Sequence, residues 1–353
     1  MTKKPFVSIC TPTFNRRPFI PALIQCFLRQ TYPRDKMEWI IVDDGTDPVD
    51  DLFASVTNSN SNSNSNSSNN VNIKYFRVEE KMRLGSKRNF MHSKCSGDII
   101  VYMDDDDYYP RERVEHAVRV LQQQPKYMIV GSSEMYIYFD SIGKVCRCGP
   151  YGKYHSTAAT FAFRKELLQQ TSFSEQDNMS EERAFLKNYT IPLYQLDPKK
   201  SIVVFSHKHN SLNKEKLLEN PEQTKTVITD LGLDSFFPNE EDDDLKMFYS
   251  KYMNEALTGY EPGRPEQKPE VLEQIRTQEE SRAKRLEENQ KILDVKKRIE
   301  DAYNRYNRDG NGDGNDGRVA ALEKQLTDKN ILIGELMKRI KDLQSELAKY
   351  KSG

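Results

Sequence analysis

The chain has 353 residues, of which 30% are charged and 36% hydrophobic. It is therefore long enough for one large α/β domain, and polar enough for part of it to lie outside a packed core. The formal net charge is −1, from 53 Lys and Arg against 54 Asp and Glu, which does not fit the basic face of a general nucleic-acid-binding protein. Because no run of about 18 apolar residues occurs, we expect no membrane-spanning helix.

The N-terminus and the cysteines bear on location. The apolar run at residues 6–10 is too short for the core of a signal peptide. The five cysteines are odd in number, and none follows Cys148. This favours a reducing, cytoplasmic setting over a fold stabilised by disulfides.

Strand-like runs alternate with helix-like stretches over residues 1–210. In chain order we expect a strand at 6–10, a helix at 18–30, strands at 38–42 and 73–78, a helix at 86–94, a strand at 98–103, a helix at 110–123, and strands at 127–130, 158–163 and 202–205. This alternation predicts an α/β fold with a mostly parallel sheet flanked by helices. Ligands of such sheets bind beyond the carboxyl ends of the strands.

Composition divides the chain into segments. Within a first domain, the Ser/Asn tract at 58–70 has no apolar residue, so we expect a flexible insertion there. The expected segments are the domain at 1–210, a helical extension at 211–262, a charged helical segment at 263–308, a Gly/Asp/Asn hinge at 309–317 and a coiled coil at 318–353.

The last segment carries a heptad pattern. Apolar residues follow 3-4 spacing from Val319 to Tyr350, which predicts a coiled coil and a homo-oligomer formed through residues 318–350. A helix docked on the chain's own surface is the alternative. The preceding loop resembles a calcium site in part, but Ala320 stands where the bidentate Glu is required, so a hinge is favoured.

Three segments that follow strands carry unusual polar residues. Thr11–Arg16 follows the first strand and suits a nucleotide base and phosphate, although a capped turn would use the same residues. Asp43–Thr46 follows the second, where a carboxylate accepts the ring N–H of a pyrimidine; an Asp-Gly turn is the alternative. Asp104–Asp107 follows the buried fourth strand, and four carboxylates there need a cation to balance them. Oxygen ligands of this kind suit Mg²⁺ or Mn²⁺ together with substrate phosphates.

A basic patch stands at the start of the helix expected at 86–94. Lys87 and Arg88, with Lys81 and Arg83 before them, lie where a helix N-terminus also attracts anions. Phosphate binding and a solvated basic face both remain open.

Four segments in this order resemble the family 2 glycosyltransferases of the GT-A fold. They are residues 7–16, 41–45, 85–89 and 103–107, and the resemblance covers about residues 5–210. The Asn-rich tract is also similar to versions from large DNA viruses, which would place the protein in the host cytoplasm.

The resemblance implies an inverting transfer from a nucleotide-diphospho-sugar, usually a UDP-sugar, to the hydroxyl of a glycan or another acceptor. It implies that Asp44 holds the uracil, that Asp106 ligates Mn²⁺ or Mg²⁺, and that Asp104 contacts ribose or metal-bound water. The run of four Asp leaves this register open by one residue. The other candidates for donor binding are Pro12, Thr13, Asn15, Arg16, Lys87, Arg88 and Asp105.

An inverting transfer needs a general base for the acceptor hydroxyl. The family's acidic pair at a helix start corresponds to Glu181 and Glu182, with Glu in place of the usual Asp at the second position. The choice between them stays open, and Asp177 is a third candidate. The structural alternative is a Ser180 cap followed by acidic residues that the helix dipole favours.

Two histidines have weaker assignments. His209 follows the strand at 202–205, where some relatives carry a metal-ligating His, but a surface loop would also explain it. His155 precedes the strand at 158–163 and is a candidate for the acceptor side.

Two other functions remain. One is an inactive GT-A scaffold assembled through its coiled coil. The other is a sugar-1-phosphate nucleotidyltransferase, which would carry a Gly-rich loop after the first strand. The sequence identifies neither the sugar nor the acceptor.

Overall fold

The computed structural model describes residues 4–59 and 72–309. Most of the Ser/Asn tract, the hinge and the predicted coiled coil therefore lie outside the described residues. The chain divides into a unit of residues Met1–Glu279 and a second unit of Glu280–Gly353. Helix α10 (Pro269–Asp309) runs across this division, and its residues 280–309 are the part of the second unit that the structure describes.

The larger sheet has the strand order β3-β2-β1-β4-β8-β5-β9. The pairs β1–β2, β1–β4, β2–β3 and β5–β9 are parallel, whereas β8 is antiparallel to both of its neighbours. The predicted α/β class with a mostly parallel sheet is confirmed. The strands are β1 (Val7–Thr13), β2 (Met37–Asp43), β3 (Ile73–Arg77), β4 (Ile99–Tyr102), β5 (Ile129–Gly131), β8 (Ala162–Arg164) and β9 (Leu193–Gln195).

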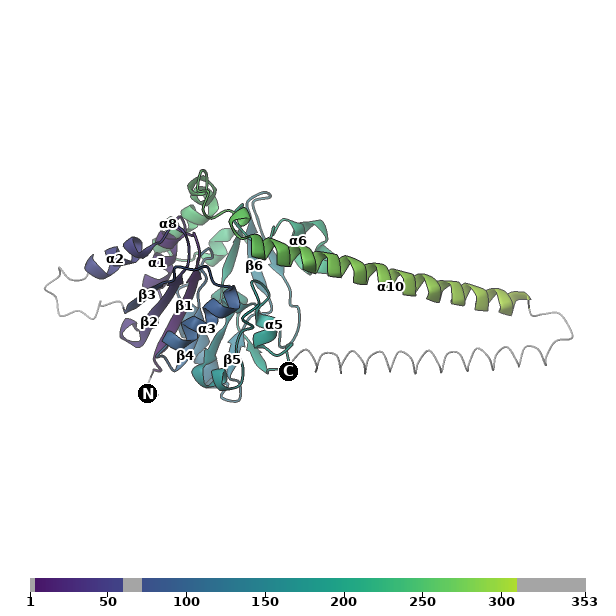
Figure 1. Ribbon diagram of the computed structural model, residues 1–353, viewed down its shortest axis with the longest axis horizontal. Helices are drawn as coiled ribbons and strands as arrows, with labels where there is room; N and C mark the ends of the chain where they lie inside the picture. The colour runs from purple at the N-terminus through teal and green to yellow at the C-terminus, as the bar shows by residue number, and fades with distance from the viewer. Residues whose placement is uncertain (1–3, 60–71, 310–353) are drawn as a thin grey trace. The chain divides into compact units, whose positions relative to one another are not determined.

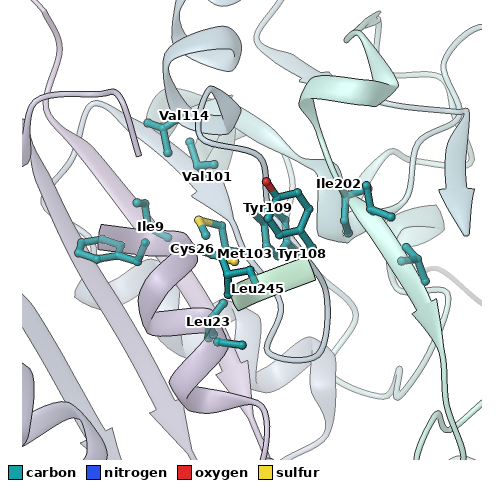
Figure 2. Packing of buried hydrophobic residues seen from close by; sticks show 14 of the residues in the cluster. Ile9, Leu23, Cys26, Val101, Met103, Tyr108, Tyr109, Val114, Ile202 and Leu245 are labelled. Atoms are coloured by element: carbon teal, nitrogen blue, oxygen red, sulfur yellow. The ribbon is translucent and has the colours of Figure 1, made fainter. Parts of the chain in front are cut away.

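Helices cover both faces of this sheet (Figure 1). Alternate strand residues enter different core clusters: Ile41 packs in one, and Ile40 and Val42 pack in the other. This is why β1, β2 and β4 are buried on both faces along their whole length. Figure 2 shows the first cluster, where Leu23 and Val114 from two helices meet Ile9 of β1.

The helices of the first domain are α1 (Ile20–Leu28), α2 (Asp50–Ser59), α3 (Leu84–Lys94), α4 (Arg113–Gln123) and α5 (Glu182–Phe185). Helices α1, α2 and α4 contribute residues to the first cluster, and α3 and α5 contribute to the second. Helix α2 was not predicted, because only a few apolar residues such as Phe53 give it a buried side.

A second sheet has the order β10-β6-β7-β11 and was predicted only at β10. Its strands are β6 (Met135–Phe139), β7 (Lys144–Cys148), β10 (Val203–Ser206) and β11 (Thr226–Ile228). An isolated bridge joins Tyr108 to Val203, which brings the start of β10 beside the residue that follows the acidic run.

The strand expected at 158–163 is wrong over its first half. Residues Ala158–Thr160 form a 3₁₀ turn, η2, and only Ala162–Arg164 joins the sheet. The reason is that the Thr160 hydroxyl is engaged locally, accepting from the Ser132 amide at 2.9 Å and contacting Ser156 at 2.8 Å.

Residues 211–262 carry short elements that belong to the main unit. They are α6 (Lys216–Glu219), α7 (Pro221–Thr224), β11, α8 (Asp243–Met247), the π-helical turn η7 (Phe248–Tyr252) and α9 (Met253–Ala256). Leu245, Tyr249 and Met253 pack into the first core cluster. The other 3₁₀ turns are η1 (Arg34–Lys36), η3 (Lys165–Gln169), η4 (Pro198–Lys200), η5 (Leu233–Phe236), η6 (Glu240–Asp242) and η8 (Pro265–Gln267).

Candidate active site

The carboxyl ends of β1, β2 and β4 meet at one edge of the larger sheet. Thr13 pairs with Asp43, and Cys10 pairs with Tyr102. The three polar segments that follow these strands are therefore brought together, as parallel strands require.

Asp44, the predicted uracil contact, is 3% exposed and already has two partners. The Met82 amide donates to its Oδ2 at 2.7 Å, and the Lys87 ammonium donates to its Oδ1. Lys87 also donates to the Thr13 carbonyl at 2.9 Å. Burial lowers the pKa of Lys87 while Asp44 opposes that shift, so Lys87 ties the second motif to the first.

Asp43 and Asn15 build the turn beside Asp44. The Asp43 carboxylate accepts from the Gly45 amide at 2.8 Å and from the Tyr75 hydroxyl at 2.6 Å. Asn15 has a φ of 54° and donates to the Pro262 carbonyl at 2.9 Å. A Cβ on Gly45 would lie 2.6 Å from the Asn15 amide nitrogen, so only glycine fits this close approach. The Asp-Gly turn that the sequence allowed is therefore present, and Asp44 lies directly beside it.

Each carboxylate of the acidic run has a different environment. Asp104 faces Arg88 at 3.3 and 3.4 Å. Arg16 lies 3.5 Å from Asp105 and 3.3 Å from Asp106, which also lies 3.3 Å from His207 Nε2. Asp107 Oδ1 is buried and has no hydrogen-bond partner among the described residues.

These environments give the carboxyl groups of the acidic run different pKa values. Burial raises the pKa of Asp105 to about 7 and that of Asp107 well above its usual range. Burial would raise the pKa of Asp106 too, but Arg16 and His207 outweigh it and hold that pKa well below its ordinary value. Asp106 is therefore the most readily ionised of these three acids.

The donor set at this edge fits a divalent cation that takes further ligands from a substrate. The side chains of Asp104 and Asp106 are 23% and 17% exposed, against 10% for Asp105. No group of three His, Cys, Asp or Glu residues among those the structure describes forms a ready metal cage. Asp104 and Asp106 would thus need phosphate oxygens of a substrate to complete the coordination, as Mg²⁺ and Mn²⁺ sites commonly do.

The histidine beside the acidic run is His207, whereas the sequence favoured His209. His207 directly follows β10, which the bridge to Tyr108 holds alongside the run. The ring nitrogens of His209 have no hydrogen-bond partner among the described residues, and its carbonyl accepts from Arg16 at 3.2 Å. Both histidines follow the same strand, so spacing alone did not distinguish them.

Arg88 joins the acidic pair to Asp104 of the acidic run. Arg88 Nε donates to Glu181 Oε1 at 2.8 Å, and Glu181 is 4% exposed. Glu182 is half-buried and forms no ion pair with the residues in the described ranges. Burial, and next the charge of Glu181, raises the pKa of Glu182 to about 7. Of the pair, Glu182 thus has the environment of a proton acceptor near neutral pH.

Asp177, the third candidate for the base, contacts the start of α3 through its backbone. Its carbonyl accepts from the Gly85 amide at 2.9 Å, and burial raises the pKa of its carboxyl group. A Cβ on Gly85 would lie 1.9 Å from the Ser174 carbonyl oxygen, which explains a glycine in this helix.

A segment that the sequence did not point to lies across the first motif. We call residues 260–268 the strap. The Pro262 carbonyl accepts from Asn15 at 2.9 Å, and the Gly263 carbonyl accepts from Arg16 at 3.3 Å. Burial, and next the neighbouring Arg16, lowers the pKa of Lys268 to about 7. The sequence divides this stretch between a helical extension ending at 262 and a charged helical segment starting at 263, and neither prediction indicated contact with the site.

Within the described ranges, no helix is both long enough and apolar enough to cross a membrane.

Comparison with known proteins gives one family and several distant relatives. The family model described as "Glycosyl transferase family 2" matches residues 8–186. An uncharacterised glycosyltransferase of Haemophilus influenzae is 28% identical over 119 residues, covering 34% of this chain and 35% of that protein. TarS of Staphylococcus aureus, a poly(ribitol-phosphate) β-N-acetylglucosaminyltransferase, is 24% identical over 118 residues, covering 33% and 19%.

TuaG of Bacillus subtilis, a putative teichuronic acid biosynthesis glycosyltransferase, is 25% identical over 122 residues, covering 34% of this chain and 44% of TuaG. The matched segment therefore spans less than half of each of these relatives. Their sources give no support to a viral origin.

Solved structures with a related arrangement share little sequence. TarS 1–349 in complex with UDP-GlcNAc has a TM-score of 0.43 at 19% identity, covering 57% of this chain and 59% of that one. The mannosyltransferase PcManGT from Pyrobaculum calidifontis, in complex with GDP-Man and Mn²⁺, has a TM-score of 0.46 at 16% identity, covering 73% and 74%.

Proposed function

The chain belongs to glycosyl transferase family 2, and from this premise we propose that it transfers a sugar from a nucleotide-diphospho-sugar to an acceptor hydroxyl with inversion at the anomeric carbon. The donor is a UDP-sugar, and the reaction depends on a divalent metal. The observation that carries this proposal is the shared contact of Arg88 with Asp104 and Glu181, which joins a donor-binding edge to an acidic pair.

The donor end is assigned to the three segments at the sheet edge. Asp44 would hold the uracil beside the backbone of Pro12 and Thr13. Asp104 and Asp106 would hold Mn²⁺ or Mg²⁺, with His207 in place of His209. When bound, the metal offsets the charge of the leaving diphosphate. Arg16 and Lys268 add positive charge on the same side of the run.

The acceptor end is assigned to Glu182. The acceptor oxygen bonds to the anomeric carbon while the bond from that carbon to the diphosphate oxygen breaks, and the acceptor proton passes to the Glu182 carboxylate. A base with a pKa near the working pH combines a large ionised fraction with useful basicity, and the pKa of Glu182 is about 7. Glu181 accepts a hydrogen bond from Arg88, which leaves Glu182 as the base and fixes the position of the pair.

Uridine as the nucleotide follows from the resemblance of Asp44 to the family's uracil-binding carboxylate. TarS is described in complex with UDP-GlcNAc, whereas PcManGT is described with GDP-Man and Mn²⁺. The nucleotidyltransferase alternative lacks its Gly-rich loop, because Thr11–Arg16 occupies that position. The scaffold alternative retains this fold but requires no donor binding.

Calorimetric titration of the full chain with UDP, with and without Mn²⁺, tests the proposal. We expect UDP binding that Mn²⁺ strengthens, weaker binding of GDP, and loss of the Mn²⁺ effect in Asp106→Asn. Asp35→Asn, at an exposed acid outside the site, is the matched control. UDP binding that is absent under both conditions would favour the scaffold.

A further inference from the structure

A cavity of about 470 Å³ lies at the same sheet edge as the acidic run, beyond the ends of β5 and β9. Its lining includes Ser132, Tyr151, Lys153, Gln195 and Lys225. Antiparallel pairing of β8 with both β4 and β5 directs the ends of β4 and β5 to one edge. The cavity is therefore on the side of the sheet where donor chemistry has been placed.

Hydrogen bonds connect the cavity wall to the acidic run. The Asp104 amide donates to the Tyr109 hydroxyl at 2.6 Å, and that hydroxyl lies 3.4 Å from the Ala159 carbonyl. One residue further along turn η2, the Thr160 hydroxyl accepts from the Ser132 amide at 2.9 Å. A single 3₁₀ turn thus separates the acidic run from the cavity.

Three half-buried rings lead from the cavity to the candidate base. The His155 ring lies 5.1 Å from the Tyr151 ring and 5.1 Å from the Tyr189 ring, measured between centroids. We call these three residues the aromatic platform. Tyr189 lies in the turn directly after α5, the helix whose first residue is Glu182. Burial, and next the charge of Glu182, raises the pKa of the Tyr189 phenol.

Hydrogen bonds hold the platform in place. Ser133 Oγ accepts from the amides of Tyr151 and Gly152 at 2.8 and 3.1 Å. Gln195 Nε2 donates to the carbonyls of Lys153 and His155, each at 3.0 Å, while its Oε1 accepts from the Ser133 amide at 2.7 Å. A surface fixed before binding loses little entropy when a ligand arrives.

The backbone around α5 is strained on both sides. Ser180 has a φ of 55°, and Lys187, Asn188 and Tyr189 have φ values of 48°, 55° and 62°. Three consecutive non-glycine residues in the left-handed region are costly, and such strain concentrates at functional sites. Here the strained turn sets Tyr189 against His155, directly after the helix that carries Glu182.

We propose that the aromatic platform and its cavity are the acceptor subsite, and that the acceptor is a saccharide chain whose terminal hydroxyl is presented to Glu182. This inference rests on the proposed function. Sugar rings present C–H faces that pack on aromatic rings, and their hydroxyl groups need the few fixed polar groups that such a cavity supplies. The ammonium groups of Lys153 and Lys225 supply them here, while the Gln195 amide is occupied in holding the wall.

The test measures saccharide binding by the full chain with UDP and Mn²⁺ present, using saturation-transfer NMR. The probes are cellohexaose as a neutral saccharide and a hyaluronan oligosaccharide as an anionic one. The variant is Tyr189→Asn, because asparagine tolerates the left-handed backbone while the ring is lost. The matched control is Tyr194→Asn on β9, an exposed ring that packs on Tyr127 outside the cavity lining.

We expect wild type and Tyr194→Asn to bind one of the probes, and Tyr189→Asn and His155→Ala to bind it about tenfold more weakly. UDP affinity should be equal in all four proteins. The inference is overturned if wild type binds neither probe, or if Tyr189→Asn binds as wild type does. Failure of UDP to bind wild type, with saccharide binding still dependent on Tyr189, would overturn the proposed function and leave the platform supported.

Discussion

Arg88 donates to Glu181 at 2.8 Å and contacts Asp104 at 3.3 Å, so one buried guanidinium is shared by the acidic run and the acidic pair. The guanidinium carbon Cζ of Arg88 lies 4.4 Å from the centre of the Tyr102 ring, and this cation–π contact holds the guanidinium group over the ring. The two halves of the proposed reaction are therefore held in register by one side chain on α3.

Arg88→Lys should disable the enzyme although it keeps the charge, because an ammonium group cannot contact Glu181 and Asp104 in the way that the planar guanidinium does. We expect kcat to fall at least about 100-fold. Because Glu181 and Asp104 lose hydrogen bonds but keep a neighbouring positive charge, the free energy of unfolding should fall by about 1.5–3 kcal/mol. Kinetics and urea denaturation measure the two effects. Arg285→Lys, at an exposed arginine on α10 that has no place in the site, should change neither.

The pH dependence of transfer should report Glu182. Because burial and Glu181 raise the pKa of Glu182 to about 7, the base is mostly protonated at pH 6 and mostly ionised at pH 8. The rate should therefore rise about tenfold between these values and then level off. Glu182→Gln should abolish transfer while UDP affinity stays unchanged. Wild-type turnover in that variant would transfer the role to Glu181 or Asp177.

Substitution of the two histidines distinguishes the metal ligand. His207→Ala should weaken Mn²⁺-dependent UDP binding by about 10- to 100-fold, since His207 Nε2 lies 3.3 Å from Asp106. His209→Ala is the matched control, because its ring nitrogens have no hydrogen-bond partner among the described residues. Calorimetric Mn²⁺ titration in the presence of UDP decides between them, and a larger loss in His209→Ala would restore the sequence-based assignment.

Gly263→Ala should displace the strap from the first motif. The added Cβ would lie 2.7 Å from His209 Nδ1 and 2.8 Å from the Asn15 carbonyl oxygen, and backbone at that distance must move. We expect a loss of about 1–3 kcal/mol in the free energy of unfolding, together with weaker UDP binding through Asn15 and Arg16. In Gly232→Ala the Cβ meets nothing within 4 Å, so that variant should match wild type in thermal denaturation and calorimetry.

A chain ending at residue 309 should be monomeric if the heptads of residues 318–350 drive assembly. Light scattering of the full chain and the shortened chain measures the difference. UDP binding should be equal in both, because the donor edge lies within residues 1–279. If light scattering gives the full-length protein the mass of a single chain, the oligomer prediction is wrong.

The sequence by itself determined the α/β class and the place of the acidic run. Apolar strand runs followed by polar residues are local signals, and parallel pairing forces the ends of those strands to one edge. Asp44, Asp104 and Asp106 could be located in this way. The strand expected at 158–163 was wrong in its first half because the Thr160 hydroxyl found local partners, which composition does not encode.

Tertiary structure alone decided which residues became neighbours. Arg88 meets Glu181 across 93 positions, and Asn15 meets Pro262 across 247. His207 rather than His209 reaches Asp106 because a bridge between Tyr108 and Val203 aligns β10. Likewise Tyr151, His155 and Tyr189 form a platform through Ser133, Gln195 and a left-handed turn. Contacts of this range depend on how separate elements pack, and the spacing of residues along the chain carries no information about that packing.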